Sequence, residues 1–383
     1  MQPTNHNLTT TPTTAPAKKF AFLVHLRSSY RADLALMAKP FGWVPDSVYR
    51  TLLKGRPFNP FVWSQVTLTP EATSPEGYII MLPYSGQQLL EQPKEMLPLV
   101  EKAMQLAHAK GAEIFGLGAL TSPITLGGKL VQQNPHVAIT NGNAYTAVIT
   151  FQKIKQLLAK HPHTKPTVAL IGATGSVGSL VAQLMANHNV AANYLLVARN
   201  TRRLNQLASQ LQTLQPGVQV QCSTCMGHVA AADVVVLLTS ASDNLLQSQH
   251  LKSGAIVLDD TQPRNTSPAL LAERPDIQLI DGGLVSVPHL QFKQRSIALP
   301  KGLSFACLAE TMLLAQAGHQ GNFSVGNPTL EQGEYILNLA RQFAHLGFDL
   351  APDHCFGRPL APQVHQLPPS ATSAQPALAF QVA

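Results

Sequence analysis

The sequence predicts an α/β protein with a doubly wound parallel sheet that is preceded by a smaller α/β domain and followed by C-terminal helices. Two observations carry this prediction. Short apolar segments alternate with helices or loops, and they lie at 167–171, 194–198, 218–221, 233–238, 255–258 and 278–280. A glycine-rich turn joins the first segment to a helix. This alternation is typical of a parallel sheet covered by helices on both faces, the Rossmann arrangement.

The composition indicates a folded chain with more than one domain. Of its 383 residues, 45% are hydrophobic and only 12% are charged. Such a composition buries a substantial core and excludes global disorder. The length exceeds that of one typical compact core, so we expect two domains with tails.

The domain boundaries follow from composition and periodicity. Disordered tails are expected at 1–17 and 357–383, which are rich in proline and lack hydrophobic periodicity. Between them we expect a substrate domain at 18–159, a dinucleotide-binding domain at 160–303, and C-terminal helices at 304–356 that pack back on the substrate domain.

Charge and hydropathy exclude several classes of protein. The net charge of +7 favours anionic ligands, but no run of Lys and Arg is interleaved with aromatic residues, so no nucleic acid is expected. No segment has the roughly 18 apolar residues of a membrane span, and the first residues do not resemble a secretion leader. We therefore expect a cytoplasmic protein with at most peripheral membrane contact.

The cysteines do not indicate a disulfide framework. Four cysteines are too few for one in a chain of this size, which favours a reducing compartment. Cys222 and Cys225, with His228 close behind, have the two-residue spacing of redox and zinc sites. No second pair exists, and Cys355 lies far along the chain, so no metal is expected.

The glycine-rich turn is the first candidate binding feature. Gly172, Gly175 and Gly178 fall between an apolar strand and a helix. Glycines there permit a tight turn and let backbone N–H groups approach a pyrophosphate. We expect the whole turn to contact a dinucleotide through Gly172, Thr174, Gly175, Ser176, Val177 and Gly178.

The end of the second strand predicts which dinucleotide binds. An acidic residue there would bind a free ribose hydroxyl, but this chain has Arg199, Asn200 and Arg202. Guanidinium groups suit a 2′-phosphate, so NADPH is the expected cofactor, unless these arginines only form a solvated helix start. Thr239 and Ser240, after the fourth strand, are expected to contact the ribose and nicotinamide.

Cys307 is the second candidate feature. A helix is expected over 304–314, with Ser304 as N-cap and Cys307 at the third helical position, where the helix dipole favours a thiolate. The alternative is a small apolar core residue, because Phe305 and Leu308 flank it. The Tyr-x-x-x-Lys pair of short-chain dehydrogenases is absent.

Several segments together resemble a known family. They are the Phe-Ala-Cys-Leu-Ala-Glu run at 305–310, residues 312–314, the Asn-Phe-Ser run at 322–324, the glycine turn at 172–175 and residues 195–200. In these segments the chain resembles the long-chain acyl-[acyl-carrier-protein] reductases of cyanobacteria. Further points of resemblance in the first domain are His25, the segments 117–124 and 140–143, and Thr146.

The resemblance implies NADPH-dependent reduction of a long-chain fatty acyl thioester to a fatty aldehyde, with the family's active cysteine at Cys307. It implies an acyl carrier protein or acyl-CoA as the acyl donor, and it allows a downstream aldehyde-consuming enzyme as a partner. A thiolate would capture the acyl group covalently, and hydride from the nicotinamide would then reduce it.

Polar residues of the first domain complete the expected site. Ser122 or Asn143 would polarise the thioester carbonyl, with Thr146 beside them, although Ser and Asn also serve as turn and cap residues. His25 has either a pocket role or a structural hydrogen-bonding role. Glu310, one turn after Cys307, either steers protons or faces solvent.

Two other functions remain open from the sequence. One is a shikimate-dehydrogenase-like NADP oxidoreductase, which needs no cysteine. The other is a non-catalytic NADPH-binding partner protein.

Overall fold

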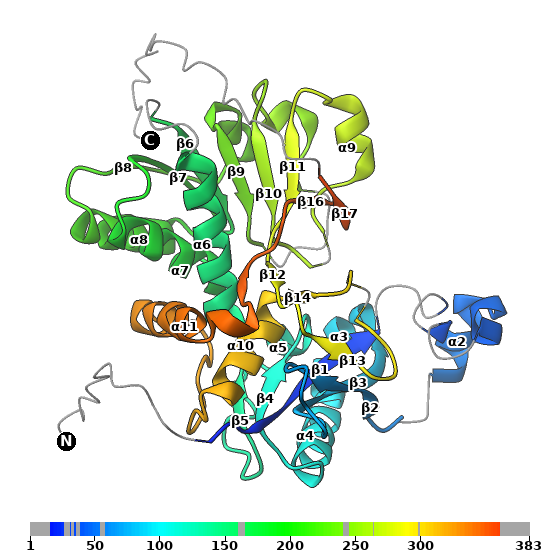
Figure 1. The fold of residues 1–383 in the computed structure, drawn as a ribbon. Helices are drawn as coiled ribbons and strands as arrows, with labels where there is room; N and C mark the ends of the chain where they lie inside the picture. Colours follow the sequence, from blue (N-terminus) through cyan, green and yellow to red (C-terminus); the bar gives the residue numbers. More distant parts are fainter. Residues whose placement is uncertain are drawn as a thin grey trace. The chain divides into compact units, whose positions relative to one another are not determined.

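The chain divides into two compact units. The computed structural model describes residues 16–26, 31, 34–35, 39–53, 58–159, 165–239, 245–262, 264–297 and 299–360. The first unit comprises Met1–Thr150 and Gly283–Pro352, and the second comprises Phe151–Gly282 and Asp353–Ala383. The chain thus changes units within helix α6 (Asn143–Ala159), directly before Gly283 and again directly after Pro352, whereas the sequence suggested changes at residues 160 and 304 (Figure 1).

The first unit is built on a mixed sheet. Its strands, in spatial order, are β13 (Gln291–Phe292), β2 (Phe61–Thr67), β3 (Gly77–Ser85), β1 (Lys19–Leu26), β4 (Ala112–Leu117) and β5 (Ala138–Thr140). From β3 to β5 neighbouring strands are parallel, whereas β2 pairs antiparallel with both β3 and β13.

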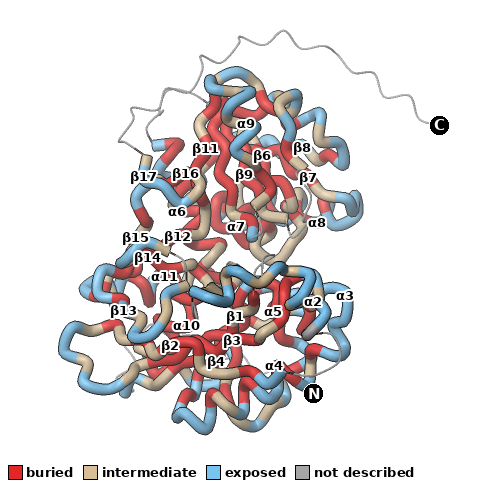
Figure 2. The backbone as a smooth tube through the Cα atoms, turned by 90° about the vertical axis from the view of Figure 1, so that its right-hand side faces the viewer, coloured by how far each residue is buried: buried red, intermediate tan, exposed pale blue. Residues whose placement is uncertain are grey.

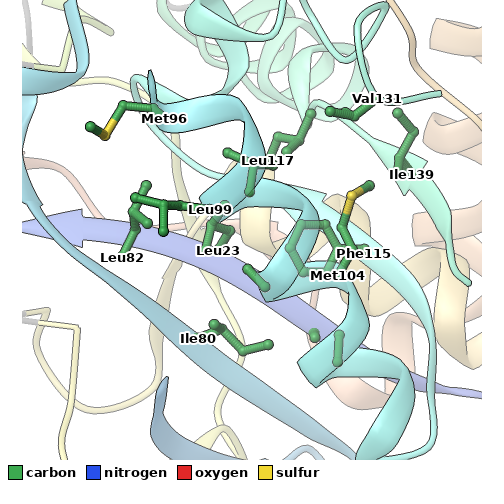
Figure 3. Packing of buried hydrophobic residues seen from close by; sticks show 14 of the residues in the cluster. Leu23, Ile80, Leu82, Met96, Leu99, Met104, Phe115, Leu117, Val131 and Ile139 are labelled. Carbon is green, nitrogen blue, oxygen red and sulfur yellow. The ribbon is translucent and has the colours of Figure 1, made fainter. Parts of the chain in front are cut away.

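Helix α4 (Pro93–Ala109) supplies much of the core of the first unit. Its buried residues recur every three to four positions, so they form one apolar face: Met96, Leu99, Val100, Ala103, Met104 and Ala107. This face packs on β3 and β4, where Leu82, Phe115 and Leu117 are buried (Figure 3).

The return segment completes the first unit. Helix α10 (Ala306–Gln316) lies against β1 and β4, and its residues are buried on nearly every side of the helix. A small antiparallel sheet, β14 (Leu303–Phe305), β12 (Leu284–Ser286) and β15 (Asp349–Leu350), precedes and follows it in the chain. Helix α11 (Leu330–Gln342) begins with a capping box between Thr329 and Gln332.

The second unit contains the predicted doubly wound sheet, which is confirmed. Its strands, in spatial order, are β11 (Gln278–Asp281), β10 (Ile256–Asp259), β9 (Val234–Leu237), β6 (Thr167–Ile171), β7 (Asn193–Val197) and β8 (Gln219–Ser223). All neighbouring pairs are parallel. The central strands are buried on both faces, and Figure 2 shows them among the buried segments. Burial on both faces explains why their sequences are continuous apolar runs.

Helices and short elements connect the strands of both units. The helices are α7 (Ser176–Asn187), α8 (Thr201–Leu214) and α9 (Pro268–Glu273), and the first unit adds α3 (Gly86–Glu91) and α5 (Thr121–Ile124). The remaining short helices are η1 (Lys39–Trp43), α2 (Asp46–Leu53), η2 (Met226–Ala231), η3 (Ser248–His250) and η4 (Ala344–Leu346). Within the described ranges, no helix combines the length and the apolar character needed to cross a bilayer.

The prediction of a disordered tail from residue 357 is wrong for its first residues, which are ordered. Strand β17 (Arg358–Pro359) pairs with β16 (His354–Cys355), and the N–H groups of Phe356 and Gly357 donate to the carboxylate of Asp281 at 3.0 and 2.7 Å. The buried carboxylate thus holds a segment that has no hydrophobic periodicity to reveal it. Residues 1–15 and 361–383 lie outside the described part.

Candidate active site

The glycine-rich turn of the second unit is closely packed at two of its glycines. Gly172 has a φ of +87°, and its N–H donates to the carbonyl of Val197 at 2.8 Å. A Cβ on Gly172 would lie 2.8 Å from the carbonyl oxygen of Leu238, and a Cβ on Gly178 would lie 2.4 Å from that of Gly172. Both positions therefore require glycine.

Helix α7 begins at Ser176, so Gly178 lies within its first turn and not before the helix, as the sequence had suggested. Gly175 is its N-cap and has no side chain to bond the first turn, which Ser176, Val177 and Gly178 form. A helix start directly after a strand suits a pyrophosphate. Thr174 lies half-exposed in the same turn.

The strand order places this turn where a dinucleotide is expected. Ile171 pairs with Val197 of β7 on one side and with Leu237 of β9 on the other, so β6 is the point where the strand order reverses. Ligands of doubly wound sheets bind at the carboxyl ends of the strands beside this point. Thr239 lies there, because a Cβ on Gly172 would be 3.0 Å from its backbone nitrogen. Ser240 lies outside the described residues.

The residues after β7 fit a phosphorylated ribose. Arg199 and Arg202 are exposed at the start of α8, so their guanidinium groups are open to an anion. Asn200 has a structural task, because its side-chain oxygen accepts the N–H of Arg203 at 3.0 Å and caps α8. No carboxylate stands at the end of β7, and the residues present therefore fit NADPH better than NADH.

Cys222 lies within β8, whereas Cys225 follows the strand in a turn that is held by local hydrogen bonds. The hydroxyl of Ser223 lies 2.8 Å from Nδ1 of His228 and accepts the N–H of Cys225 at 2.9 Å. Among the residues that the structure describes, no group of three or more His, Cys, Asp or Glu side chains is arranged to hold a metal ion.

Cys307 lies in the first turn of α10, in the first unit. The sequence suggested Ser304 as the N-cap of this helix, which is wrong. Ser304 is a fully buried residue of β14, and its hydroxyl donates to the carbonyl of Phe305 at 3.0 Å. Phe305 is the N-cap, so Cys307 occupies the second helical position, and its side chain is half-buried. The strand pairing of 303–305 with β12 is what displaces the helix start.

Gly142 touches Cys307. A Cβ on Gly142 would lie 2.2 Å from Cβ of Cys307 and 2.6 Å from its Cα, and the φ of Gly142 is +79°. This glycine directly precedes α6, whose first turn carries Asn143 and Thr146, both half-buried. The structure thus brings together Cys307 and the turn that carries both predicted substrate-binding residues.

Glu310, one helical turn after Cys307 on α10, accepts hydrogen bonds from the residues on either side of Gly142. One carboxylate oxygen accepts the N–H of Tyr145 at 2.7 Å and the other accepts the hydroxyl of Thr140. The side chain is fully buried, so the suggestion that it faces solvent is wrong. Burial raises the pKa of Glu310 to about 7, against the effect of its hydrogen bonds to Thr140, Tyr145 and the backbone of Gly142 and Ala144, which lower it.

Asn141 holds the turn from the other side. Its amide donates to the carbonyls of Gly127 and Gly326 at 3.1 and 2.9 Å. Its side-chain oxygen accepts the hydroxyl of Ser324 at 2.7 Å and the N–H of Asn143 at 3.0 Å. Sequence reasoning gave no role to Asn141 itself, although it lies in a segment that carried the family resemblance.

His25 lies near the end of β1 and Ser122 lies in α5, after β4; both are outside the direct contacts of Cys307 described above. Ser122 is buried in α5, and its carbonyl accepts the N–H of Gly127 at 2.8 Å, which links it to the Asn141 network. His25 donates from Nδ1 to the carbonyl of Leu26 at 2.7 Å, and its Nε2 accepts the N–H of Leu120 at 3.3 Å. These contacts favour a structural role for His25.

Comparison with known proteins gives one partial family match. A model described as shikimate / quinate 5-dehydrogenase matches residues 153–281, less than half of the chain. Among solved structures, quinate dehydrogenase from Corynebacterium glutamicum in complex with NAD is 14% identical with a TM-score of 0.38, covering 84% of this chain and 99% of that one.

Two curated proteins are similar over longer stretches. The chain is 25% identical to the aminotransferase PigE of Serratia sp. (strain ATCC 39006), over 87% of this chain but only 40% of that protein. It is 28% identical to a long-chain acyl-[acyl-carrier-protein] reductase of Synechococcus elongatus, over 62% of this chain and 72% of that protein. The chain therefore spans less than half the length of the first relative. The family match and the strand order support an oxidoreductase with an NAD(P)-binding fold.

Proposed function

We propose that this protein reduces a long-chain fatty acyl thioester to a fatty aldehyde with NADPH, through an acyl-enzyme on Cys307. The observation that carries the proposal is the half-buried Cys307 in the first turn of α10, pressed against Gly142. The similarity to an acyl-[acyl-carrier-protein] reductase supports the same reaction.

The chemistry fits a thiol at a helix start. The N-terminal end of α10 favours the thiolate of Cys307, which attacks the thioester carbonyl. A bond forms between the cysteine sulfur and the acyl carbon, the bond to the donor sulfur breaks, and the donor leaves as a thiol with the proton that Cys307 lost. When bound, NADPH would supply the hydride that adds to the acyl carbon, and the resulting hemithioacetal anion would collapse to aldehyde and release Cys307 as the thiolate.

The polar residues around Cys307 have supporting roles in this proposal. Asn143 and Thr146, on the first turn of α6, contact the acyl group. Ser122 supports that turn from a distance, through Gly127 and Asn141. In the second unit, the turn from Gly172 to Gly178 holds the pyrophosphate, and Arg199 and Arg202 hold the 2′-phosphate. The acyl donor is an acyl carrier protein or coenzyme A, and the net charge of +7 suits an acidic carrier.

Intact-mass spectrometry tests the proposal. The protein is incubated with a long-chain acyl-CoA, or with the same acyl group on a carrier protein, in the absence of NADPH. We expect the mass of one acyl group to be added to the wild type and to Cys225→Ala, which changes an exposed cysteine, but not to Cys307→Ala. Adding NADPH should remove the adduct and release aldehyde. An adduct that persists in Cys307→Ala, or none in the wild type, contradicts the proposal.

A second candidate function rests on the family match at 153–281. It is a shikimate-dehydrogenase-like NADP oxidoreductase that acts without a covalent intermediate. This candidate predicts that Cys307→Ala keeps NADP-dependent oxidation of shikimate or quinate, which a spectrophotometric assay would detect.

A further inference from the structure

Glu310 and Cys307 lie one turn apart on α10 and contact the same short segment. Cys307 contacts Gly142 through its Cα and Cβ, and the carboxylate of Glu310 accepts hydrogen bonds from Thr140 and Tyr145. Cys307 is half-buried, whereas Glu310 has an exposed fraction of 0%. A carboxylate that substrate cannot reach acts on the site only through the groups it binds.

The hydrogen bonds of Glu310 fix the conformation of that segment. Its carboxylate binds the backbone N–H groups of Gly142, Ala144 and Tyr145. These are N–H groups at the start of α6, which have no partner within the helix, so the carboxylate both caps α6 and ties it to α10. The N–H of Asn143 is held separately by the side chain of Asn141.

Residue 142 therefore has little freedom to move. Its left-handed φ is set by the flanking hydrogen bonds, and any outward movement of the segment would open a gap beside Cys307. No other described side chain bonds both ends of the segment at Thr140 and Tyr145, which makes Glu310 the link between the two helix starts.

We propose that Glu310 is a positioning residue for Cys307: through Thr140 and the first N–H groups of α6 it holds Gly142 against the cysteine and so fixes the direction of its sulfur. This inference rests on the proposed role of Cys307 as nucleophile. It assigns to Glu310 no contact with substrate or cofactor.

Site-resolved alkylation tests the inference without any thioester. The wild type, Glu310→Gln and Glu310→Ala are treated with iodoacetamide, and the modification of each cysteine is followed by peptide mass spectrometry. Gln keeps one accepting oxygen and can donate its amide to the hydroxyl of Thr140, whereas Ala keeps neither. We expect the rate ratio of Cys307 to exposed Cys225 to change slightly in Gln and at least tenfold in Ala.

Steady-state kinetics separate positioning from general damage. If Glu310 positions the nucleophile, kcat falls about 100-fold in Glu310→Ala, the KM for NADPH is unchanged, and Gln restores most of the loss. Glu331→Gln, on the exposed side of α11, is the matched control and should behave as wild type. Thr140→Val, which removes one hydrogen-bonding partner at nearly constant volume, replaces Glu310→Ala if that variant does not fold.

The outcomes distinguish this inference from the proposed function. Wild-type alkylation ratios and kcat in Glu310→Ala, or in Thr140→Val in its place, overturn the positioning role while leaving the acyl-enzyme intact. Absence of an acyl adduct on wild-type Cys307 overturns the proposed function, and the alkylation ratios still decide whether Glu310 sets the geometry of the thiol.

Discussion

Gly142 and Cys307 meet where two helices begin: Gly142 immediately precedes α6, and Cys307 is the second residue of α10. The contact joins backbone to side chain with no space for a methyl group between them. The space beside Cα and Cβ of Cys307 is therefore limited by a residue without a side chain, which no pattern of polar or apolar residues reveals.

Gly142→Ala should displace Cys307. The new Cβ would lie 2.2 Å from that of Cys307, and the φ of +79° disfavours any residue with a Cβ. We expect a loss of about 1–3 kcal/mol in the free energy of unfolding and acyl-adduct formation slowed about 100-fold. Urea unfolding and intact-mass kinetics measure the two effects. Gly321→Ala is the control, because it has a φ of +73° but nothing within 4 Å of its Cβ.

Gly178→Ala should affect only the second unit. A Cβ there would lie 2.4 Å from the carbonyl oxygen of Gly172, so the turn must shift. We expect the dissociation constant for NADPH to rise about tenfold or more, which corresponds to about 1.4 kcal/mol, with acyl-adduct formation at Cys307 unchanged. Fluorescence titration gives the affinity. Gly227→Ala, whose Cβ would meet only Cys225 Sγ at 3.6 Å, should bind normally.

Arg199→Asp should change the choice of cofactor. The exposed guanidinium follows β7, and a carboxylate in its place would accept the ribose hydroxyl of NADH and repel the 2′-phosphate of NADPH. We expect the ratio of kcat/KM for NADPH over NADH to fall about 100-fold. Arg341→Asp, in the last turn of α11, controls for the change of charge. An unaltered ratio would show that Arg199 is only part of a solvated helix start.

Local patterns predicted much of the second unit from the sequence. Most of its sheet strands are apolar runs of a few residues, the edge strand β8 being the exception. The glycine turn directly joins a strand to the following helix, so neighbouring residues carry the signal. The fold and the location of the turn follow from that.

The surroundings of Cys307 were less predictable because their partners are distant in the chain. Glu310 binds Thr140 across 170 positions, and Ser324 binds Asn141 across 183. The expected cap at Ser304 fails for a related reason, since β12 recruits that residue into a strand. Long-range pairing thus overrode a local capping signal.

Asp281→Asn should destabilise the second unit and loosen the segment at 354–359. Burial tends to raise the pKa of Asp281, but the hydrogen bonds and charge of Arg264 and the N–H groups of Phe356 and Gly357 outweigh it and hold the pKa below its usual value. Removing the charge leaves Arg264 without its ion-pair partner, and because the Arg264 side chain is 29% exposed, we expect a cost below the roughly 3–5 kcal/mol of a fully buried pair.

The acid dependence of this effect has a definite sign. Because the pKa of Asp281 is lowered in the folded protein, its contribution is present above its unfolded value of 3.8 and is lost as the pH falls through the folded value. The difference between wild type and Asp281→Asn in urea unfolding should therefore shrink from pH 7 to pH 3. Asp276→Asn, which breaks the more exposed pair with Arg274, should cost much less.

Glu310 should give the folded protein the opposite dependence on pH. Its pKa rises from 4.5 to about 7 on folding, chiefly because burial penalises the charged form. The folded state then binds more protons than the unfolded state between these values. The contribution of Glu310 is fully present below pH 4.5 and is lost as the pH rises through about 7, by about 3 kcal/mol at about 1.4 kcal/mol per pH unit.

Glu310→Gln removes this titration. We expect the free energy of unfolding of the wild type to fall relative to that of Glu310→Gln as the pH rises from 4.5 to 7.5, measured by urea unfolding at several pH values. Glu331→Gln, an exposed carboxylate on α11, should follow the wild-type curve instead. If the free energies of unfolding of the wild type and Glu310→Gln changed in parallel with pH, the carboxyl of Glu310 would not change its protonation in this range. The carboxylate would then bind the start of α6 with no loss of stability as the pH rises.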